Sequence, residues 1–272
     1  MEIALTSSLN DCHLPYLEYV EYRCALVAEA VYRNESLPQY GLPLATEEQI
    51  PRLTGKFRLC DLTDDVREAF YYDQRSDSFM LAFSGTDPMN PNDLINNISQ
   101  FAGLTADYYQ QGVQLVQSIA ESDRGKILLT GHSLGGGVAT VAAVAGRMNA
   151  VVFNPPALHQ NTLNKFDGLN LALAESNVRR FVVAGEILDI VNHIPSFRHT
   201  FIGEKTQLYG SFNIPLSSIF SLSASLKKFI PGVGLALGVL SPILEKSVRL
   251  HLMDEVLYGL RGFLGKRSEN FL

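Results

Sequence analysis

Apolar and amphipathic segments follow one another along the first third of the chain. Residues 16–33 place charged side chains on one side and apolar side chains on another at helical spacing, which predicts a helix. Residues 66–72 and 79–83 are rich in apolar and aromatic residues and predict two strands. The polar residues 73–78 between them favour a hairpin connection.

The middle of the chain alternates between predicted helices and predicted strands. A helix is expected at about residues 104–121, and a second one, built mostly of glycine and alanine, at residues 135–148. Residues 126–130, 150–153 and 178–184 are short apolar runs typical of buried parallel strands. This order predicts right-handed βαβ units and an α/β fold, with an open, mostly parallel sheet and helices on both faces.

The length and composition of the chain favour one domain. A chain of 272 residues is long enough for a single large α/β domain, and 46% hydrophobic residues are enough for a sizeable core. No internal repeat, low-complexity tract or linker is visible. We therefore expect residues 1–272 to form one domain.

Charge, cysteine content and the first residues of the chain limit the classes of partner and compartment. A net charge of −6 and a pI of about 5.5 argue against nucleic acid as a partner, because phosphate binding requires a basic surface. Three cysteines without regular spacing indicate neither a disulfide framework nor a zinc site. Residues 1–10 lack the basic and apolar regions of a signal peptide, so we expect cytoplasmic synthesis, with signal-independent secretion left open.

An apolar segment stands apart near the end of the chain. Residues 229–244 carry no charge, but this run is shorter than the roughly 20 residues that span a bilayer, and prolines and glycines interrupt it. We expect an insertion at residues 215–247. Either residues 215–244 form a mobile lid or a hairpin in peripheral contact with a membrane, or they form a buried helix pair that covers the edge of the sheet.

A serine flanked by glycines lies between a predicted strand and a predicted helix. The segment Gly131–Gly135 has the pattern Gly-x-Ser-x-Gly, with Ser133 at its centre. Such a turn exposes a serine above the sheet, and glycines are needed where side chains would collide. Ser133 is the predicted nucleophile, and the backbone N–H of Leu134 is a predicted donor to an oxyanion. A glycine-rich turn that only packs or binds an anion is the alternative.

A carboxylate and a histidine should follow this serine, in that order. After the strand at residues 178–184 we choose Asp189 as the acid, with Glu186, which is nearer to the strand end, as the second choice. His251 is the predicted base, because it begins an apparent helix late in the chain and could lie over the serine. His199 is the alternative, since His193 would have to fold back tightly to reach the serine.

With these residues in place, the sequence resembles the class 3 lipases, the fungal triacylglycerol-lipase-like branch of the α/β-hydrolases. The segments that carry the resemblance are residues 81–86, 131–136, 153–158 and 189–195. The resemblance implies the α/β-hydrolase fold, Asp189 and His251 as partners of the serine, and an oxyanion hole formed by Thr86 and Leu134.

Two features depart from the family pattern. Ser84 stands where the family usually has an arginine, so the structural role of that arginine is either absent or filled by another group. The lid of the fungal members would fall near residues 87–101, which are polar here, whereas the apolar segment of this chain lies between the predicted acid and the predicted base.

These residues together predict a serine carboxylic-ester hydrolase that acts on lipid acyl esters, either of phospholipids or of neutral glycerides. The chemistry would proceed through a Ser-His-Asp triad and an acyl-enzyme intermediate. No metal or organic cofactor is implied. The alternatives are a thioesterase or peptidase with the same fold, or a non-catalytic relative that binds a membrane or a protein.

Overall fold

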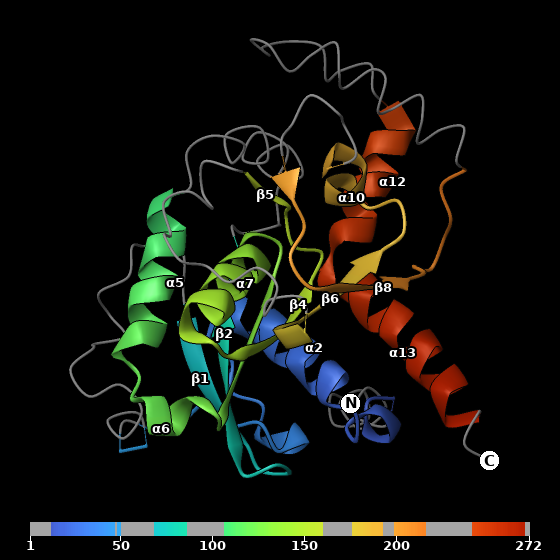
Figure 1. Cartoon of the computed structure of the whole chain (residues 1–272). Helices are drawn as coiled ribbons and strands as arrows, with labels where there is room; N and C mark the ends of the chain where they lie inside the picture. Colours follow the sequence, from blue (N-terminus) through green and yellow to red (C-terminus); the bar gives the residue numbers. More distant parts are fainter. Residues whose placement is uncertain are drawn as a thin grey trace.

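A six-stranded, mostly parallel sheet forms the centre of the computed structural model, which describes residues 12–46, 48–49, 68–85, 106–159, 176–192, 199–215 and 241–269 (Figure 1). The strands run in the order β1-β2-β3-β4-β6-β8. β1 and β2 are antiparallel, and each later pair is parallel. The strand bounds are Glu68–Asp73, Ser78–Phe83, Ile127–His132, Asn149–Phe153, Val178–Val183 and Glu204–Leu208.

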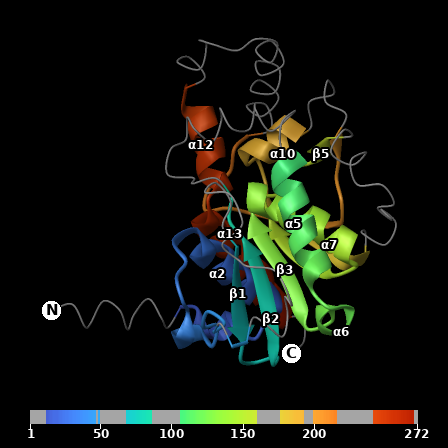
Figure 2. The same ribbon diagram turned by 90° about the vertical axis from the view of Figure 1, so that its left-hand side faces the viewer.

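Helices cover both faces of this sheet, and a separate apolar cluster lies under each layer (Figure 2). α2 (Val20–Ala30) and α13 (Met253–Glu269) pack on one face, and α5 (Ala106–Ser118) and α7 (Leu134–Gly146) pack on the other. Each face of a buried parallel sheet must be covered by apolar surface, which explains the two layers. The predicted α/β-hydrolase fold class is confirmed by this layered sheet.

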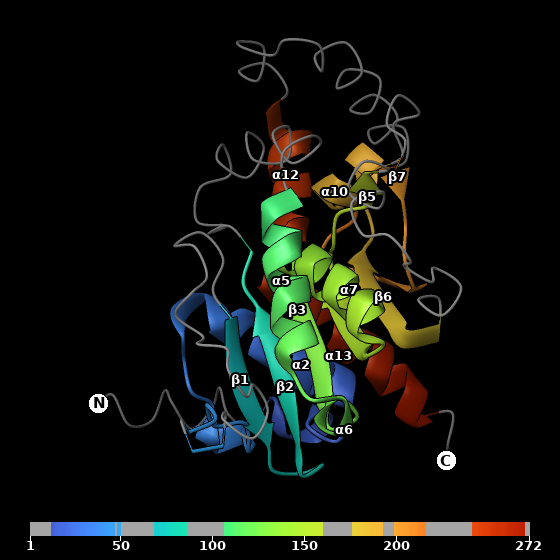
Figure 3. The ribbon, with the colours of Figure 1, turned by 60° about the vertical axis from the view of Figure 1, so that its left-hand side comes forward.

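Smaller elements connect this framework. α10 packs beside α12 (Figure 3). Both lie at the end of the molecule that also holds the β5–β7 pair and the ends of the parallel strands. The bounds of these elements are β5 Leu158–His159, α10 Ile187–Asn192, β7 His199–Thr200 and α12 Ser241–His251. Short helical turns are η1 Leu14–Tyr16, η2 Val31–Arg33, η3 Pro38–Tyr40 and α6 Glu121–Arg124.

The helix predicted at residues 16–33 is present as η1, α2 and η2, but α2 is buried nearly all round. Glu21, on the predicted charged side, is itself buried, and so is Arg23. Arg23 pairs with Asp73 at 2.9 Å, and Glu21 pairs with Arg179 at 2.5 Å. The charged residues are tolerated inside because each has an ionic partner.

Close approach between α7 and the sheet depends on two glycines at its start. A Cβ atom on Gly135 would lie 2.1 Å from the carbonyl oxygen of Phe83, and one on Gly131 would lie 2.5 Å from the carbonyl group of Gly135. Both contacts are with backbone, which cannot move aside. The turn between β3 and α7 therefore requires glycine at both positions.

The insertion predicted at residues 215–247 is only partly described. Residues 216–240 lie outside the described residues, so neither the lid nor the buried helix pair is tested there. Residues 241–247 begin α12, a helix that ends at His251. Among the helices that the structure describes, none is both long enough and apolar enough to cross a membrane.

Candidate active site

Ser133 occupies a strained turn between β3 and α7. Its φ of 56° and ψ of −129° place a residue with a side chain in a region that favours glycine. The amide N–H of Ser133 donates to the carbonyl oxygen of Phe153 at 3.0 Å, which fixes the turn against the end of β4. The serine is 7% exposed. A strained strand-to-helix turn of this kind is the backbone geometry that a nucleophile elbow requires.

The end of β2 lies beside this elbow. A Cβ atom on Gly85 would be 3.3 Å from the backbone nitrogen of Leu134 and 3.0 Å from the carbonyl oxygen of His132. Leu134 is the first residue of α7, so its N–H has no acceptor within the helix. Thr86, the other predicted oxyanion residue, follows Gly85 directly and lies outside the described residues.

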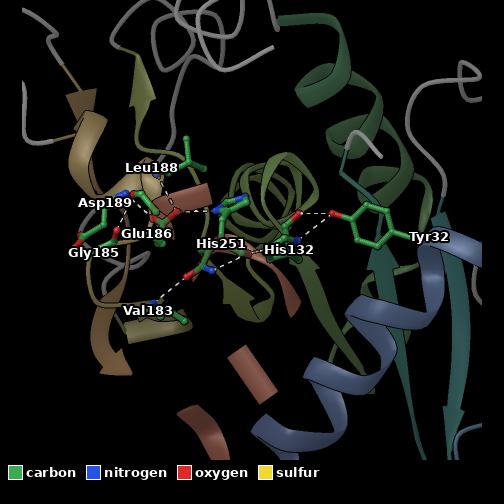
Figure 4. Close-up of polar contacts among 10 residues, drawn as sticks. Tyr32, His132, Val183, Gly185, Glu186, Leu188, Asp189 and His251 are labelled. Carbon is green, nitrogen blue, oxygen red and sulfur yellow. Dashed lines mark hydrogen bonds and ion pairs between the residues drawn. The ribbon is translucent and has the colours of Figure 1, made fainter. Parts of the chain in front are cut away.

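His251 lies against the elbow with its ring fully buried. The centre of its ring is 4.7 Å from that of His132, the residue before Ser133. Atom Nδ1 lies 2.6 Å from Oε2 of Glu186 (Figure 4). Atom Nε2 is buried and has no hydrogen-bond partner among the described residues.

The expected local structure around His251 is wrong in one respect. The residue ends α12 and does not begin a helix; α13 starts after it, at Met253. The turn between the two helices lies at the ends of β3 and β4, where His132 and Asn154 contact the main-chain oxygen of His251. The alternative base His199 lies in β7, where it is paired with His159 of β5, and His193 lies outside the described residues.

Glu186, and not Asp189, is the carboxylate on the histidine ring. Besides His251 Nδ1, its oxygens accept the backbone N–H of Leu188 at 2.8 Å and that of Asp189. Glu186 is 1% exposed. These donors belong to the first turn of α10, where backbone N–H groups have no acceptor within the helix.

Asp189 faces another partner. Its Oδ1 accepts from Nζ of Lys205 on β8 at 2.8 Å. The sequence interpretation treats residues after β6 as a loop, but α10 begins at Ile187, and the helix turns Asp189 toward β8. Asp189, the first choice from the sequence, is therefore corrected to Glu186, the second choice, as the carboxylate beside His251. The signal in the sequence that favoured Glu186 was its shorter distance to the end of the strand.

Burial sets the protonation of this pair. It lowers the pKa of His251 below the usual value of 6.5, so the imidazole is neutral near pH 7 and Nε2 can accept a proton. Burial raises the pKa of Glu186, and the nearby charge of Asp189 acts in the same direction. The backbone N–H groups of Leu188 and Asp189 oppose this rise, because they favour the carboxylate form.

Three residues around the site were not selected from the sequence as site residues. Tyr32 and His132 form a hydrogen bond at 3.0 Å, and both His132 and Asn154 contact the main-chain oxygen of His251. Asn154 follows β4 and has a φ of 43°, which an asparagine tolerates better than most residues. In the sequence, the place of Asn154 directly after a predicted strand and next to Pro155 was the signal that could have marked it as a site residue.

Comparison with known proteins places the chain in a family. The family described as Tle-like phospholipase domain matches residues 23–237. The chain belongs to this family. The match covers most of the chain, from α2 into the segment before α12, and includes Ser133 and Glu186. It confirms the kinship with lipase-type α/β-hydrolases that the sequence motifs predict.

Individual relatives are more distant. The chain is 34% identical over 99 residues to the extracellular phospholipase A1 of Serratia liquefaciens, and the match covers 36% of this chain and 30% of the relative. The chain thus spans less than a third of the length of this curated relative. Lip2 lipase of Yarrowia lipolytica is similar with a TM-score of 0.44 and 19% identity, covering 72% of this chain and 78% of the lipase. Rhizomucor miehei lipase in its propeptide complex is similar with a TM-score of 0.42 and 14% identity, covering 75% of this chain and 70% of the lipase.

Proposed function

We propose that the chain is a serine hydrolase that cleaves acyl esters of lipids, with Ser133, His251 and Glu186 as its triad. One observation carries the proposal: a buried His251 ring, hydrogen-bonded to Glu186 through Nδ1, lies against a strained serine elbow, and its Nε2 has no hydrogen-bond partner in the part of the chain that the structure describes. A neutral imidazole with one nitrogen occupied by a carboxylate and the other available is the arrangement of a general base.

The proposed mechanism has two half-reactions, in which Ser133 is first acylated and then released. Nε2 of His251 takes the proton of the Ser133 hydroxyl while Oγ attacks the acyl carbonyl carbon. The Leu134 N–H, together with Thr86, stabilises the oxyanion of the tetrahedral intermediate. His251 then gives the proton to the departing alcohol, which leaves an acyl-enzyme. A water molecule, deprotonated by the same nitrogen, then attacks the acyl carbon; the bond to Ser133 Oγ breaks, the fatty acid leaves, and His251 returns the proton to Oγ.

Phospholipid is the substrate class that we favour over neutral glyceride. Its support is the family match and the name of the Serratia relative. Peripheral contact between residues 215–244 and the substrate membrane stays a proposal from the sequence, as do a single domain over residues 1–272 and cytoplasmic synthesis followed by signal-independent secretion. A lipid surface as the site of attack would be consistent with an apolar segment between acid and base.

Fatty-acid release from phosphatidylcholine vesicles, triglyceride emulsion and p-nitrophenyl esters tests the proposal. We expect release from vesicles, and a loss of about 10⁶-fold in kcat for Ser133→Ala, as for removal of a triad serine elsewhere. A fluorophosphonate probe should label Ser133 in the wild-type protein and not in this variant. Undiminished activity of Ser133→Ala would refute the mechanism, and turnover of thioesters or peptides alone would refute the substrate class.

A further inference from the structure

Two side chains from neighbouring strands meet on one main-chain oxygen, that of His251. Nε2 of His132, at the end of β3, lies 2.6 Å from it (Figure 4). Nδ2 of Asn154, just after β4, lies 3.0 Å from it. The last carbonyl groups of a helix have no donor within that helix. Here, at the end of α12, this oxygen accepts from two buried donors.

The orientation of the Asn154 amide follows from its partners. Its Oδ1 accepts the backbone N–H of Val183 at 2.9 Å, so its NH₂ group faces the His251 carbonyl oxygen and must donate. Val183 ends β6, and its own carbonyl oxygen accepts the N–H of Glu186 at 3.2 Å. One buried asparagine side chain thus connects the strand that carries the acid with the backbone of the base.

The tautomer of His132 follows by the same reasoning. A carbonyl oxygen only accepts, so Nε2 of His132 must carry a hydrogen. Nδ1 then accepts from the hydroxyl of Tyr32, which is 3.0 Å away. Burial lowers the pKa of His132 well below its usual value, which is consistent with a neutral ring that has one donor and one acceptor.

Both donors are also tied to the serine. His132 precedes Ser133 in the chain, and Asn154 follows Phe153, whose carbonyl oxygen accepts the Ser133 N–H at 3.0 Å. The two side chains that bind the His251 backbone therefore belong to residues directly next to those that fix the backbone of Ser133. A shift of the His251 backbone relative to the elbow would break two buried hydrogen bonds, and a buried group left unpaired is costly.

We infer that His132 and Asn154 are positioning residues that hold His251 so that Nε2 faces Ser133. Neither touches the reacting atoms; each acts on the backbone of the base. The inference rests on the proposed triad. It predicts that loss of either donor slows the chemical step without weakening substrate binding, because a displacement of about 1 Å in a catalytic group can cost roughly 100-fold.

Asn154→Asp isolates the donor. The aspartate keeps the shape and the acceptor for the Val183 N–H, but it places an oxygen against the His251 carbonyl oxygen. We expect kcat on phosphatidylcholine vesicles, and the maximal rate of fluorophosphonate labelling, to fall about 10- to 100-fold with KM within twofold of wild type. Asn149→Asp, at the exposed start of β4, makes the same chemical change and should leave both values unchanged.

A second pair of variants keeps the test decisive if Asn154→Asp does not fold. His132→Gln can place an amide NH₂ near the position of Nε2, whereas His132→Phe has no donor. The glutamine variant should retain at least fivefold more kcat than the phenylalanine variant at similar KM. Equal kcat in both, or wild-type kcat in a folded Asn154→Asp, would overturn the inference. A wild-type protein that neither turns over esters nor reacts with the probe would overturn the proposed function instead.

Discussion

Two buried pairs of titratable side chains lie at different places in the sheet, one an arginine–carboxylate ion pair and the other a hydrogen-bonded imidazole–carboxyl pair, and they use their polar atoms differently. Arg23 on α2 pairs with Asp73 at the end of β1, and His251 pairs with Glu186 just after β6. The side chains are almost equally buried, at 7% and 0% exposed for the first pair and 0% and 1% for the second. Desolvation is therefore severe at both, and hydrogen bonding is what distinguishes them.

At the first pair the donors and acceptors are used within the fold. Arg23 also donates to the carbonyl oxygens of Leu17 and Glu18, at 2.7 and 3.0 Å, and Asp73 also accepts from the N–H of Arg75 and the hydroxyl of Ser76. At the second pair, Nε2 of His251 is left without a partner among the described residues. A cluster that only stabilises the fold satisfies its atoms, whereas a catalytic one keeps an atom available for substrate chemistry.

The largest expected effect comes from Glu186→Gln. Both carboxylate oxygens accept N–H groups, and an amide would turn its NH₂ group toward either His251 or the N–H of Asp189. We expect kcat to fall about 10⁴-fold, which is the scale of losing the triad acid in a serine protease. Steady-state hydrolysis of p-nitrophenyl esters measures it.

Asp189→Asn is the matched control for that variant. Asp189 lies three residues further along α10 and pairs with Lys205, so its kcat should stay within threefold of wild type. If Asp189→Asn proved the more damaging change, the assignment of the acid to Glu186 would be wrong.

Arg23→Met should act on stability and leave the chemistry intact. Removing the guanidinium leaves the Asp73 carboxylate buried without its cation, which costs about 3–5 kcal/mol in the free energy of unfolding. Urea denaturation measures this loss, and kcat per folded molecule should not change. Lys205→Met breaks the more exposed pair with Asp189 and should cost about 1 kcal/mol or less. Equal losses in both variants would contradict the comparison.

A backbone collision in the elbow should have a smaller effect. In Gly131→Ala the new Cβ would meet the carbonyl group of Gly135 at 2.5 Å, and we expect a loss of about 1–3 kcal/mol together with slower ester hydrolysis. Gly125→Ala, where no heavy atom lies within 4 Å of the new Cβ, should change stability by about 0.5 kcal/mol or less. Thermal unfolding and kcat of the two variants are the measurements.

The smallest expected effect is a displaced acid limb in the pH profile. The base works as a neutral imidazole, and burial lowers the pKa of His251 below 6.5, so activity should persist at pH 6.5 and decline only as the pH falls through the lowered value. The Arg23–Asp73 pair has no part in this limb, so Arg23→Met should show the same profile as wild type. A limb above pH 6.5 in kcat/KM would contradict the effect of burial.

Local sequence patterns were enough to predict the turn at Ser133 and the central strands of the sheet around it. The strand before Ser133, the glycines at the turn and the small residues of α7 are neighbours in the chain, so the geometry that they impose is visible in the sequence. β8 was missed, because Glu204–Leu208 is a polar edge strand without the apolar run of a central one. Buried charges on α2 were also unexpected, since periodicity does not reveal that α13 and the sheet enclose that helix.

The sequence alone was enough to propose Ser133 as the nucleophile, the order of the triad and His251 as the base, because these predictions follow from spacing and from the chemistry that each side chain can perform. Only the tertiary structure decided between Glu186 and Asp189. The two carboxylates lie three residues apart, and the start of α10 sets which of them faces the ring. The same holds for His132 and Asn154, whose role depends on a main-chain oxygen about a hundred residues away along the chain. No local pattern encodes such a contact, because it exists only once β3, β4 and α12 have packed together.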